Sequence, residues 1–238
     1  MSQSKHPIVY DLAQSSSTKE DVNPLKLRWS NQDISTLEDA SLDAPDLICL
    51  SHLRWDFVYQ RPQHLLTRCV RDRRVFFIEE PLFSTDDRAW LDISQRDSGV
   101  WVVVPHLPEG LAQESAIALQ KQLLDDLFIA CSIRDYVFWY YTPMALAFTD
   151  HLQPLAIVYD CMDELSAFQG APPALRQREI ELFQKADLVF TGGQSLYEVK
   201  RHQHPNVYAF PSSIDAPHFA QARRAIAEPL DQVNIPHP

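Results

Sequence analysis

Short apolar runs recur along the chain from residue 46 onward, and stretches with helical patterning separate most of them. Seven runs rich in β-branched and aromatic residues predict strands over Leu47–Leu50, Val75–Ile78, Val100–Val104, Tyr136–Tyr141, Leu155–Tyr159, Leu188–Thr191 and Val207–Phe210. The intervals predict helices over Gln60–Arg71, Leu111–Ile133, Pro143–His151, Pro172–Ala186 and Gln194–His202. Apolar strands that alternate with helices are typical of a mostly parallel sheet covered on both faces. We therefore expect one doubly wound α/β domain of about seven strands over residues 46–215.

The two ends of the chain differ from this central part. Residues 1–45 contain the polar run Ser15–Thr18 and few large apolar side chains. Such a segment buries too little surface to offset its ordering entropy, so we expect a flexible leader, with Trp29 as an anchor on the domain. Residues 216–238 are interpreted as a linker that leads toward a further element.

The composition narrows the class of protein. Hydrophobic residues make up 45% of the 238 positions and charged residues 22%, which is ordinary for a globular chain. The formal net charge of −11 argues against a nucleic acid partner, because no overall positive field faces the phosphates. The four cysteines stand too far apart for a metal or redox motif. With no signal peptide or apolar span in the sequence, we expect a cytoplasmic protein without a metal or cofactor.

The loop after the first predicted strand is the most informative place for a site, because ligands of open parallel sheets bind beyond the carboxyl ends of the strands. This loop contains Arg54, Trp55 and Asp56, and the helix that follows opens at Gln60 and Arg61. A helix N-terminus offers unpaired N–H groups and a partial positive charge to an anion. Arg61 in the first turn works against the helix dipole, and an anionic partner would offset that. A solvated helix face is the alternative.

Arginines are concentrated in the same region. Between Arg54 and Arg74 there are six Arg against two Asp, a local net charge of +4 in an acidic protein. The plain interpretation is a solvated helix end, where cations are favourable. A weak peripheral contact with anionic lipid at the inner face of the cell membrane is compatible with the same residues.

Two further groups follow later strands. Asp160 comes at the end of the fifth predicted strand, with Asp163 and Glu164 close behind it. A carboxylate there can act as a general base, bind a sugar hydroxyl or cap a helix. The pair Gly192–Gly193 after the sixth strand suits a tight turn into a helix. The sequence contains no dinucleotide fingerprint, P-loop or nucleophile elbow, which removes the usual nucleotide-cofactor, NTPase and hydrolase interpretations.

The run from Ala186 to Phe219, ADLVFTGGQSLYEVKRHQHPNVYAFPSSIDAPHF, resembles the end of the N-terminal domain of GT-B glycosyltransferases of family 4 (group 1). These enzymes transfer sugars in polysaccharide and glycolipid synthesis. The pair Trp55–Asp56 with Gln60–His64, and the run Tyr159–Glu164, are similar to a teichuronic-acid-transferase-like subgroup. The resemblance covers about residues 46–219 and implies a Rossmann-like GT-B N-terminal domain.

The resemblance implies a retaining, metal-independent hexosyltransferase that uses a nucleotide sugar as substrate and a glycan or lipid-linked acceptor. It places Asp160 as the catalytic residue, where the family often holds a His. For the donor phosphates and sugar it implies Arg54, Arg61, Gly192 and Gly193. For acceptor or sugar contacts it implies Trp55, Asp56, Gln60, His64, Tyr141, Asp163 and Glu164. For Trp55 and Tyr141, core packing is the competing interpretation.

The family's glycine-rich loop after the first strand is absent here, and His52–Trp55 stand in its place. Enzymes of this fold bind the nucleotide sugar mainly in a second domain, which we expect to be supplied in cis or in trans. We therefore expect little or no activity from this chain alone. Two alternatives remain: a non-catalytic binding or scaffold module, and an unrelated doubly wound enzyme using Asp160 with Glu164 on a phosphorylated substrate.

Overall fold

The computed structural model describes residues 27–30, 44–225, 227, 231–232 and 235. Most of the expected leader (1–26 and 31–43) and part of the expected linker therefore lie outside the described residues. Within the leader, Leu27–Ser30 form strand β1, and the Trp29 ring packs edge-on against Trp101 with ring centroids 5.8 Å apart. Trp29 thus contacts the domain as expected, as part of a strand of its sheet.

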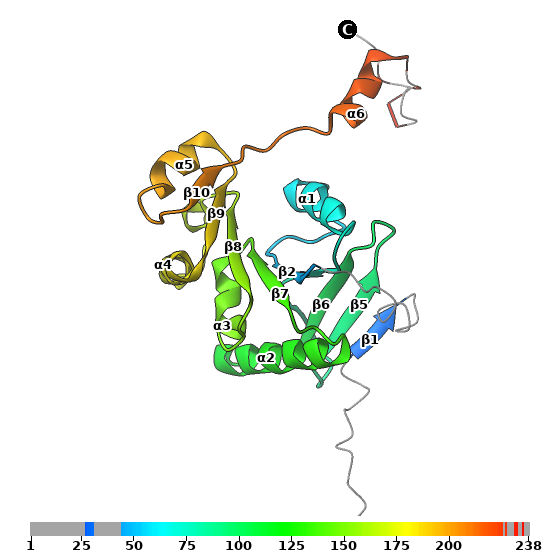
Figure 1. Cartoon of the computed structure of the whole chain (residues 1–238). Coiled ribbons are helices and arrows are strands. Elements are labelled where there is room, and N and C mark those ends of the chain that lie inside the picture. The colour runs from blue at the N-terminus through cyan, green and yellow to red at the C-terminus, as the bar shows by residue number, and fades with distance from the viewer. Residues whose placement is uncertain (1–26, 31–43, 226, 228–230, 233–234, 236–238) are drawn as a thin grey trace, which may run out of the picture.

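One mixed sheet forms the centre of the molecule (Figure 1). Its order is β1-β5-β6-β3-β2-β7-β8-β9-β10, and β4 pairs with β6 beside this path. The strands after β1 are β2 (Asp46–Leu50), β3 (Val75–Ile78), β4 (Leu82–Ser84), β5 (Trp90–Gln95), β6 (Trp101–Pro108), β7 (Tyr136–Tyr140), β8 (Ala156–Cys161), β9 (Leu188–Thr191) and β10 (Val207–Ala209). The β5–β6 pairing is antiparallel, whereas the other pairings among the described strands are parallel.

The expected fold class is confirmed, with ten strands in place of about seven. All seven predicted strands are present, and β1, β4 and β5 add to them. The helices are α1 (Arg61–Cys69), α2 (Gln113–Ala130), α3 (Leu146–Thr149), α4 (Leu175–Lys185), α5 (Gln194–Lys200) and α6 (Ala216–Phe219). Single 3₁₀ turns lie at Pro143–Ala145, Leu165–Ala167 and Ala220–Arg223. None of the helices in the described part of the chain has the length and apolar character needed to cross a bilayer.

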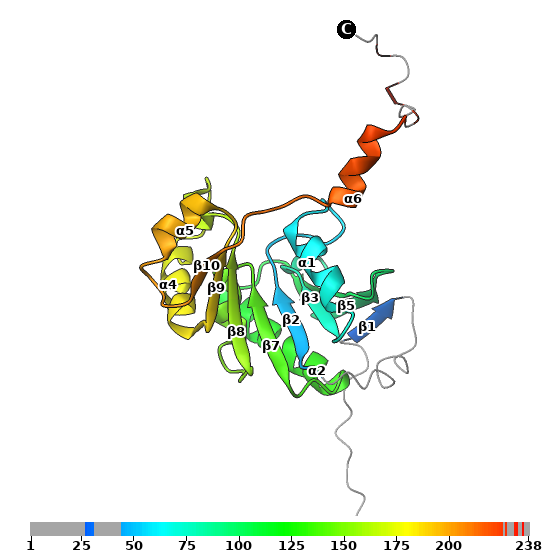
Figure 2. The ribbon, with the colours of Figure 1, turned by 45° about the horizontal axis from the view of Figure 1, so that its top comes forward.

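Alternate residues of the central strands build two cores, because successive side chains of a strand point to opposite faces. On one face, Leu47 and Cys49 of β2 lie in a cluster with Leu66 of α1. On the other face, Ile48 and Leu50 lie in a cluster with residues of α2 and α4. Figure 2 shows α1 and α2 on opposite faces of the sheet.

The chain reverses its direction of travel across the sheet at β2. It moves from β2 through α1 to β3 on one side, and from β6 through α2 to β7 on the other. The carboxyl ends of β2 and β7 therefore flank the switch point of a doubly wound sheet, where such folds bind ligands.

Candidate functional site

A pocket of about 680 Å³ lies beyond the carboxyl ends of the strands on the α1 side. Three segments line it: Tyr59–Arg61 with the first turns of α1, Met162–Asp163 after β8, and Phe210–Asp215 after β10. Figure 1 shows the chain after β10 leaving the sheet and passing α1 on its way to α6. We call this cavity the Arg61 pocket and residues 210–225 the extension.

An ion pair joins these segments. The Nε atom of Arg61 donates to both carboxylate oxygens of Asp160, at 3.1 and 2.9 Å, and its Nη1 donates to the Phe210 carbonyl oxygen at 2.6 Å. The Arg61 side chain is 10% exposed and that of Asp160 is 0% exposed. Asp160 therefore lies beneath Arg61, and the Arg61 guanidinium borders the pocket together with the charged side chains of Arg68, Asp163 and Asp215.

The surroundings of Asp160 are buried and polar. Burial raises the pKa of Asp160, and the hydrogen bonds and charge of Arg61 oppose the rise. The Tyr141 hydroxyl and the Trp139 indole N–H also favour its charged form, although neither comes into full hydrogen-bond geometry with a described partner. Burial and the nearby Asp160 charge in turn raise the pKa of Tyr141. In this geometry Asp160 orients Arg61, and its prediction as a catalytic residue stays a prediction.

Four residues expected at the site do line the Arg61 pocket: Gln60, Arg61, His64 and Asp163. Gln60 begins α1, and its N–H donates to Gln63 Oε1 at 2.9 Å, which fixes the helix start. The His64 ring meets Tyr59 edge-on with ring centroids 4.6 Å apart. Asp163 is exposed on the pocket rim.

Arg54 and Asp56 are held elsewhere, outside the lining of this pocket. Arg54 Nη1 donates to Glu79 Oε2 at 2.9 Å and to the Glu80 carbonyl oxygen at 2.6 Å. Asp56 pairs with Arg96 at 2.6 Å. The expected role of Arg54 at the donor phosphates therefore needs a rearrangement of these contacts.

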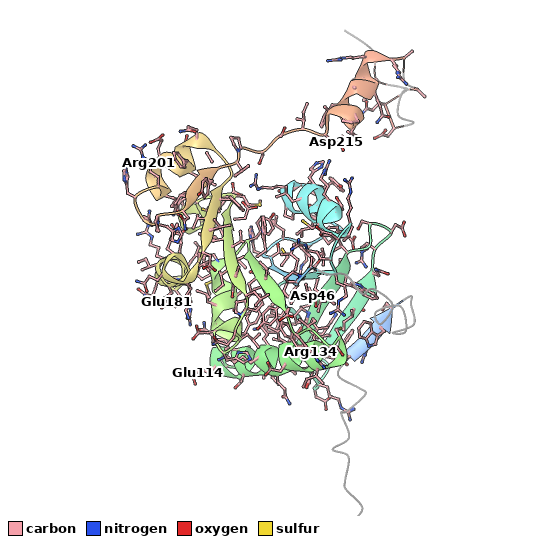
Figure 3. The ribbon with its side chains drawn as sticks, viewed as in Figure 1. Asp46, Glu114, Arg134, Glu181, Arg201 and Asp215 are labelled. Carbon is pink, nitrogen blue, oxygen red and sulfur yellow. The ribbon has the colours of Figure 1, made fainter. Side chains whose placement is uncertain are left out.

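The local excess of arginine is largely neutralised. Besides Arg54 and Arg61, Arg73 pairs with Asp72 and Arg74 with Asp46. Asp46 is the first residue of β2, so the Arg74–Asp46 pair lies at the amino end of that strand, whereas the pocket lies beyond the carboxyl ends. Figure 3 shows Asp215, which lines the pocket, outside the sheet at the start of α6. Arg68 and Arg71 are the two of these six arginines that form no ion pair with a described residue.

Trp55 and Tyr141 are packed in the core, as the competing interpretation expects, and their role in sugar contact stays a prediction. Trp55 is 8% exposed and packs edge-on against Phe77 with ring centroids 5.0 Å apart. Tyr141 is 1% exposed. Both rings are enclosed by the core on the α1 face.

Glu164 belongs to a separate polar cluster. Its carboxylate pairs with Lys200 Nζ at 2.9 Å and accepts a hydrogen bond from the Ser166 hydroxyl at 2.8 Å. Lys200 is 3% exposed and also pairs with Glu179 at 2.8 Å. Two carboxylates thus neutralise one buried cation, which leaves Glu164 in a structural contact.

The two glycines differ in their surroundings. A Cβ on Gly192 would lie 2.6 Å from the Met162 carbonyl oxygen, so the turn after β9 packs directly on the loop after β8. A Cβ on Gly193 would meet nothing within 4 Å. Gly192 therefore permits a close approach that shapes the pocket floor at Met162.

His52 was not among the expected site residues. It follows the end of β2, and its Nδ1 is buried without a hydrogen-bond partner among the described residues. Burial lowers the pKa of His52, while the charge of Asp163 opposes this. Its position directly after a central strand was the available sequence signal. In the part of the chain that the structure describes, no group of three or more His, Cys, Asp or Glu side chains could hold a metal ion.

Solved structures share the fold. Sucrose-phosphate synthase from Thermosynechococcus elongatus superposes with a TM-score of 0.51 at 7% identity over 76% of this chain and 52% of that chain. An apo structure of OtsA gives a TM-score of 0.51 at 10% identity over 80% of this chain and 55% of that chain. The chain thus spans about half the length of these structures. No protein-family model matches the sequence, and a comparison with characterised proteins finds no match. The comparisons establish that this chain shares a Rossmann-like α/β domain fold with these structures.

Proposed function

We propose that this chain is the acceptor-side domain of a GT-B glycosyltransferase, which transfers a sugar from a nucleotide-sugar donor to a glycan or lipid-linked acceptor. The observation that carries the proposal is the Arg61 pocket at the carboxyl edge of a sheet with the fold of these enzymes. Its volume lies in the range of about 300–1,000 Å³ that small-molecule sites occupy.

The role of Arg61 follows from charge. Sugar transfer from a nucleotide sugar leaves a diphosphate, and a positioned cation stabilises the negative charge that develops on it. Arg61 is a planar donor in the first turn of α1. Because Pro62 lacks an N–H and the capping box of Gln60 and Gln63 engages the Gln63 N–H, the guanidinium is the main donor that this helix start offers to an anion. Asp160 holds this guanidinium in one orientation through both of its oxygens.

The donor-binding half is proposed to come from a second domain, in cis or in trans. Support comes from apolar side chains that the extension leaves uncovered: Phe210, Ile214 and Phe219 are 54%, 65% and 57% exposed. Exposed apolar groups that lie together are typical of interaction surfaces. The coverage of about half of each matched structure points the same way.

The finer assignments remain part of this proposal. They are family 4 membership with a teichuronic-acid-transferase-like subgroup, a hexosyl donor, retention of configuration, transfer without a metal ion, and a cytoplasmic location. A weak contact with anionic lipid at the inner membrane face would rest on Arg68 and Arg71, since the other four arginines of the region are ion-paired.

The direct test is calorimetric titration of the purified chain with a panel of UDP-, GDP- and ADP-sugars. We expect one of them to bind through its diphosphate, and Arg61→Gln to weaken that binding by roughly tenfold. Arg71→Gln is the matched control, because Arg71 is an exposed arginine beyond the end of α1 and outside the pocket. Because most donor contacts are proposed to come from the second domain, this binding should be weak. Equal affinities for the two variants would contradict the proposed role of Arg61 and favour the non-catalytic module.

A second prediction concerns turnover. Because the donor-binding half supplies most of the charge stabilisation for the leaving diphosphate, we expect the isolated chain to show little or no sugar transfer. Product formation from nucleotide sugar and a mixed acceptor pool, followed by mass spectrometry, measures this. Turnover at the rates of ordinary enzymes, about 1–10³ s⁻¹, would show that the chain needs no second half.

A further inference from the structure

A second pocket, of about 460 Å³, opens at the same edge of the sheet. Its walls come from the strand ends at Leu50–Ser51 and Ile78–Pro81, from Ala116–Ile117 of α2, and from Ala147–Phe148 of α3. We call it the switch pocket, because it lies where β2 and β7 flank the reversal of the sheet. α1 borders the Arg61 pocket and α2 the switch pocket, so the two lie on opposite faces of the sheet.

The walls of the switch pocket are mainly apolar. Leu50, Ile78 and Ala145 form a buried floor at 1%, 3% and 3% exposure. Phe83 at the mouth is 51% exposed, so the pocket is open to solvent. A smaller void of about 10 Å³ lies behind it and shares Ile78, Gln120 and Phe148 with it. Water in such a pocket finds few hydrogen-bond partners. Its replacement by an apolar group therefore lowers the free energy of the system.

The polar atoms of the buried walls already have partners. Ser51 Oγ accepts a hydrogen bond from the Leu53 N–H at 3.0 Å, and Thr142 Oγ1 accepts one from the Met144 N–H at 3.3 Å. Glu79 accepts from Arg54 and from the Trp55 N–H. These groups therefore already accept hydrogen bonds within the chain, and the free area of the pocket is mainly apolar.

The charge of the switch pocket selects against anions. Glu79 and Glu80 are the charged members of the described lining, which contains no Lys, Arg or His. Arg54 offsets the Glu79 charge, whereas the Glu80 side chain has no ion-pair partner among the described residues. A ligand that carries a carboxylate or phosphate into this pocket would face the Glu80 charge, which Arg54 offsets without forming an ion pair.

We propose that the switch pocket binds an uncharged apolar group, the alkyl or acyl chain of an amphiphile. The assignment of this group to the acceptor rests on the proposed function: the chain of a lipid-linked acceptor would lie in the switch pocket, with its polar end toward the loop Ser51–Gln60 that separates the two pockets. The binding of an apolar chain to the switch pocket does not itself depend on sugar transfer.

The first test uses neutral alkyl glucosides of four to eight carbons, titrated by calorimetry below their micelle-forming concentrations. Each methylene that leaves water should tighten binding by about fourfold until the pocket is filled. The heat capacity change on binding should be negative, as burial of apolar surface requires. Affinity that does not depend on chain length would overturn the proposal.

The second test fills the pocket. Ala116→Phe places a ring in the switch pocket, whereas Ala118→Phe places the same ring on the exposed side of the same helix. We expect Ala116→Phe to weaken hexyl glucoside binding by about tenfold and Ala118→Phe to leave it unchanged. Ala147→Phe fills the pocket from α3 and covers the case in which Ala116→Phe does not fold. Equal binding by the filled variants and Ala118→Phe would overturn the proposal.

The third test addresses charge. Heptanoate should bind the native chain more weakly than hexyl glucoside, and Glu80→Gln should narrow the difference without changing hexyl glucoside binding. A carboxylate that binds as well as the neutral ligand would overturn the charge selection. An affinity that does not depend on chain length would count against the switch pocket alone, whereas equal nucleotide-sugar affinities for Arg61→Gln and Arg71→Gln would count against the proposed function alone.

Discussion

Arg61 and Asp160 form an ion pair with almost no access to water. At 10% and 0% exposure, both groups have lost most of their hydration, and the attraction between them offsets part of that cost. Such a pair adds little stability compared with an apolar pair of the same shape, but removing one partner leaves a buried charge uncompensated. Its value to the molecule lies in fixing the direction of the Arg61 guanidinium.

We expect Asp160→Asn to destabilise the fold by roughly 3 kcal/mol in urea unfolding, because it leaves Arg61 without its counter-ion. The double variant Arg61→Leu with Asp160→Asn should cost less than the sum of the two single variants, since it removes the unpaired charge. Additive costs would show that the two side chains are energetically independent.

Gly192 gives a second prediction at the scale of one residue. Gly192→Ala places a Cβ 2.6 Å from the Met162 carbonyl oxygen, and neighbouring backbone must move to relieve the overlap. We expect a loss of roughly 1–3 kcal/mol in urea unfolding. Gly193→Ala, with nothing within 4 Å, should cost less than about 1 kcal/mol, the effect of a poorer helix cap. Equal urea unfolding midpoints for Gly192→Ala and Gly193→Ala would contradict the predicted overlap between the new Cβ and the Met162 carbonyl oxygen.

Part of the site was predictable from the positions of residues after strands. This rule brought Gln60, Arg61, His64 and Asp163 to one pocket, because parallel strands end at one edge. The rule did not predict which groups each of these side chains contacts. Trp55 follows a strand as Gln60 does, yet its ring turns into the core, a choice made by tertiary packing against Phe77.

At the scale of elements, Lys200 joins three segments. It reaches from α5 to Glu179 of α4 and to Glu164 in the loop after β8, and Glu179 also accepts a hydrogen bond from the Tyr159 hydroxyl of β8 at 2.8 Å. Burial favours the neutral form of Glu164, but hydrogen bonds from Lys200 and Ser166 outweigh it and lower the pKa of Glu164. The cluster thus holds α4 and α5 against the end of β8.

We expect Lys200→Met to destabilise the fold by roughly 3 kcal/mol at neutral pH, because Glu179, whose side chain is 13% exposed, loses its cation. Since the pKa of Glu164 is lowered on folding, its contribution is present above the ordinary value of 4.5 and is lost as the pH falls below it. The difference between native chain and variant should therefore shrink in acid, as thermal unfolding across pH 3–7 would show.

Lys185→Met is the matched control for that experiment. Lys185 pairs with Asp150 at 2.5 Å, but the two side chains are 46% and 55% exposed. Exposed pairs contribute about 1 kcal/mol or less, so this variant should unfold close to the native chain. A cost as large as that of Lys200→Met would show that burial does not set the difference.

Element prediction succeeded where apolar residues are continuous and failed where they alternate. Leu188–Thr191 is a strand with the expected bounds. Trp90–Gln95 alternates apolar and polar positions, as the outer, antiparallel part of a sheet permits, and a search for continuous runs passes over it. Leu27–Ser30 and Leu82–Ser84 are strands only through their partners β5 and β6, which no local pattern reveals.

At the scale of the whole molecule, the loop Ser51–Gln60 stands between two cavities of opposite character. One is bordered by Arg61 and the other is mainly apolar with two carboxylates. Both arise from the reversal of the chain at β2, which leaves space at the edge of the sheet on either face. The loop Ser51–Gln60 can therefore contact a single amphipathic ligand that reaches both cavities, or two separate ligands, one in each cavity.

The strand order also has a consequence for synthesis on the ribosome. Among the described strands β1 is made first, but Leu27 pairs with Leu91 of β5, and β5 joins the other described strands through β6. Each of β7 to β10, in contrast, adds to an edge that has already been translated. In the nascent chain, β2 and β3 should therefore pair before β1 does. β1 should stay without a partner strand until β6 has been synthesised and has paired with β5. Pulse-labelled hydrogen exchange should protect β5 amides no earlier than β6 amides, and the reverse order would exclude this route.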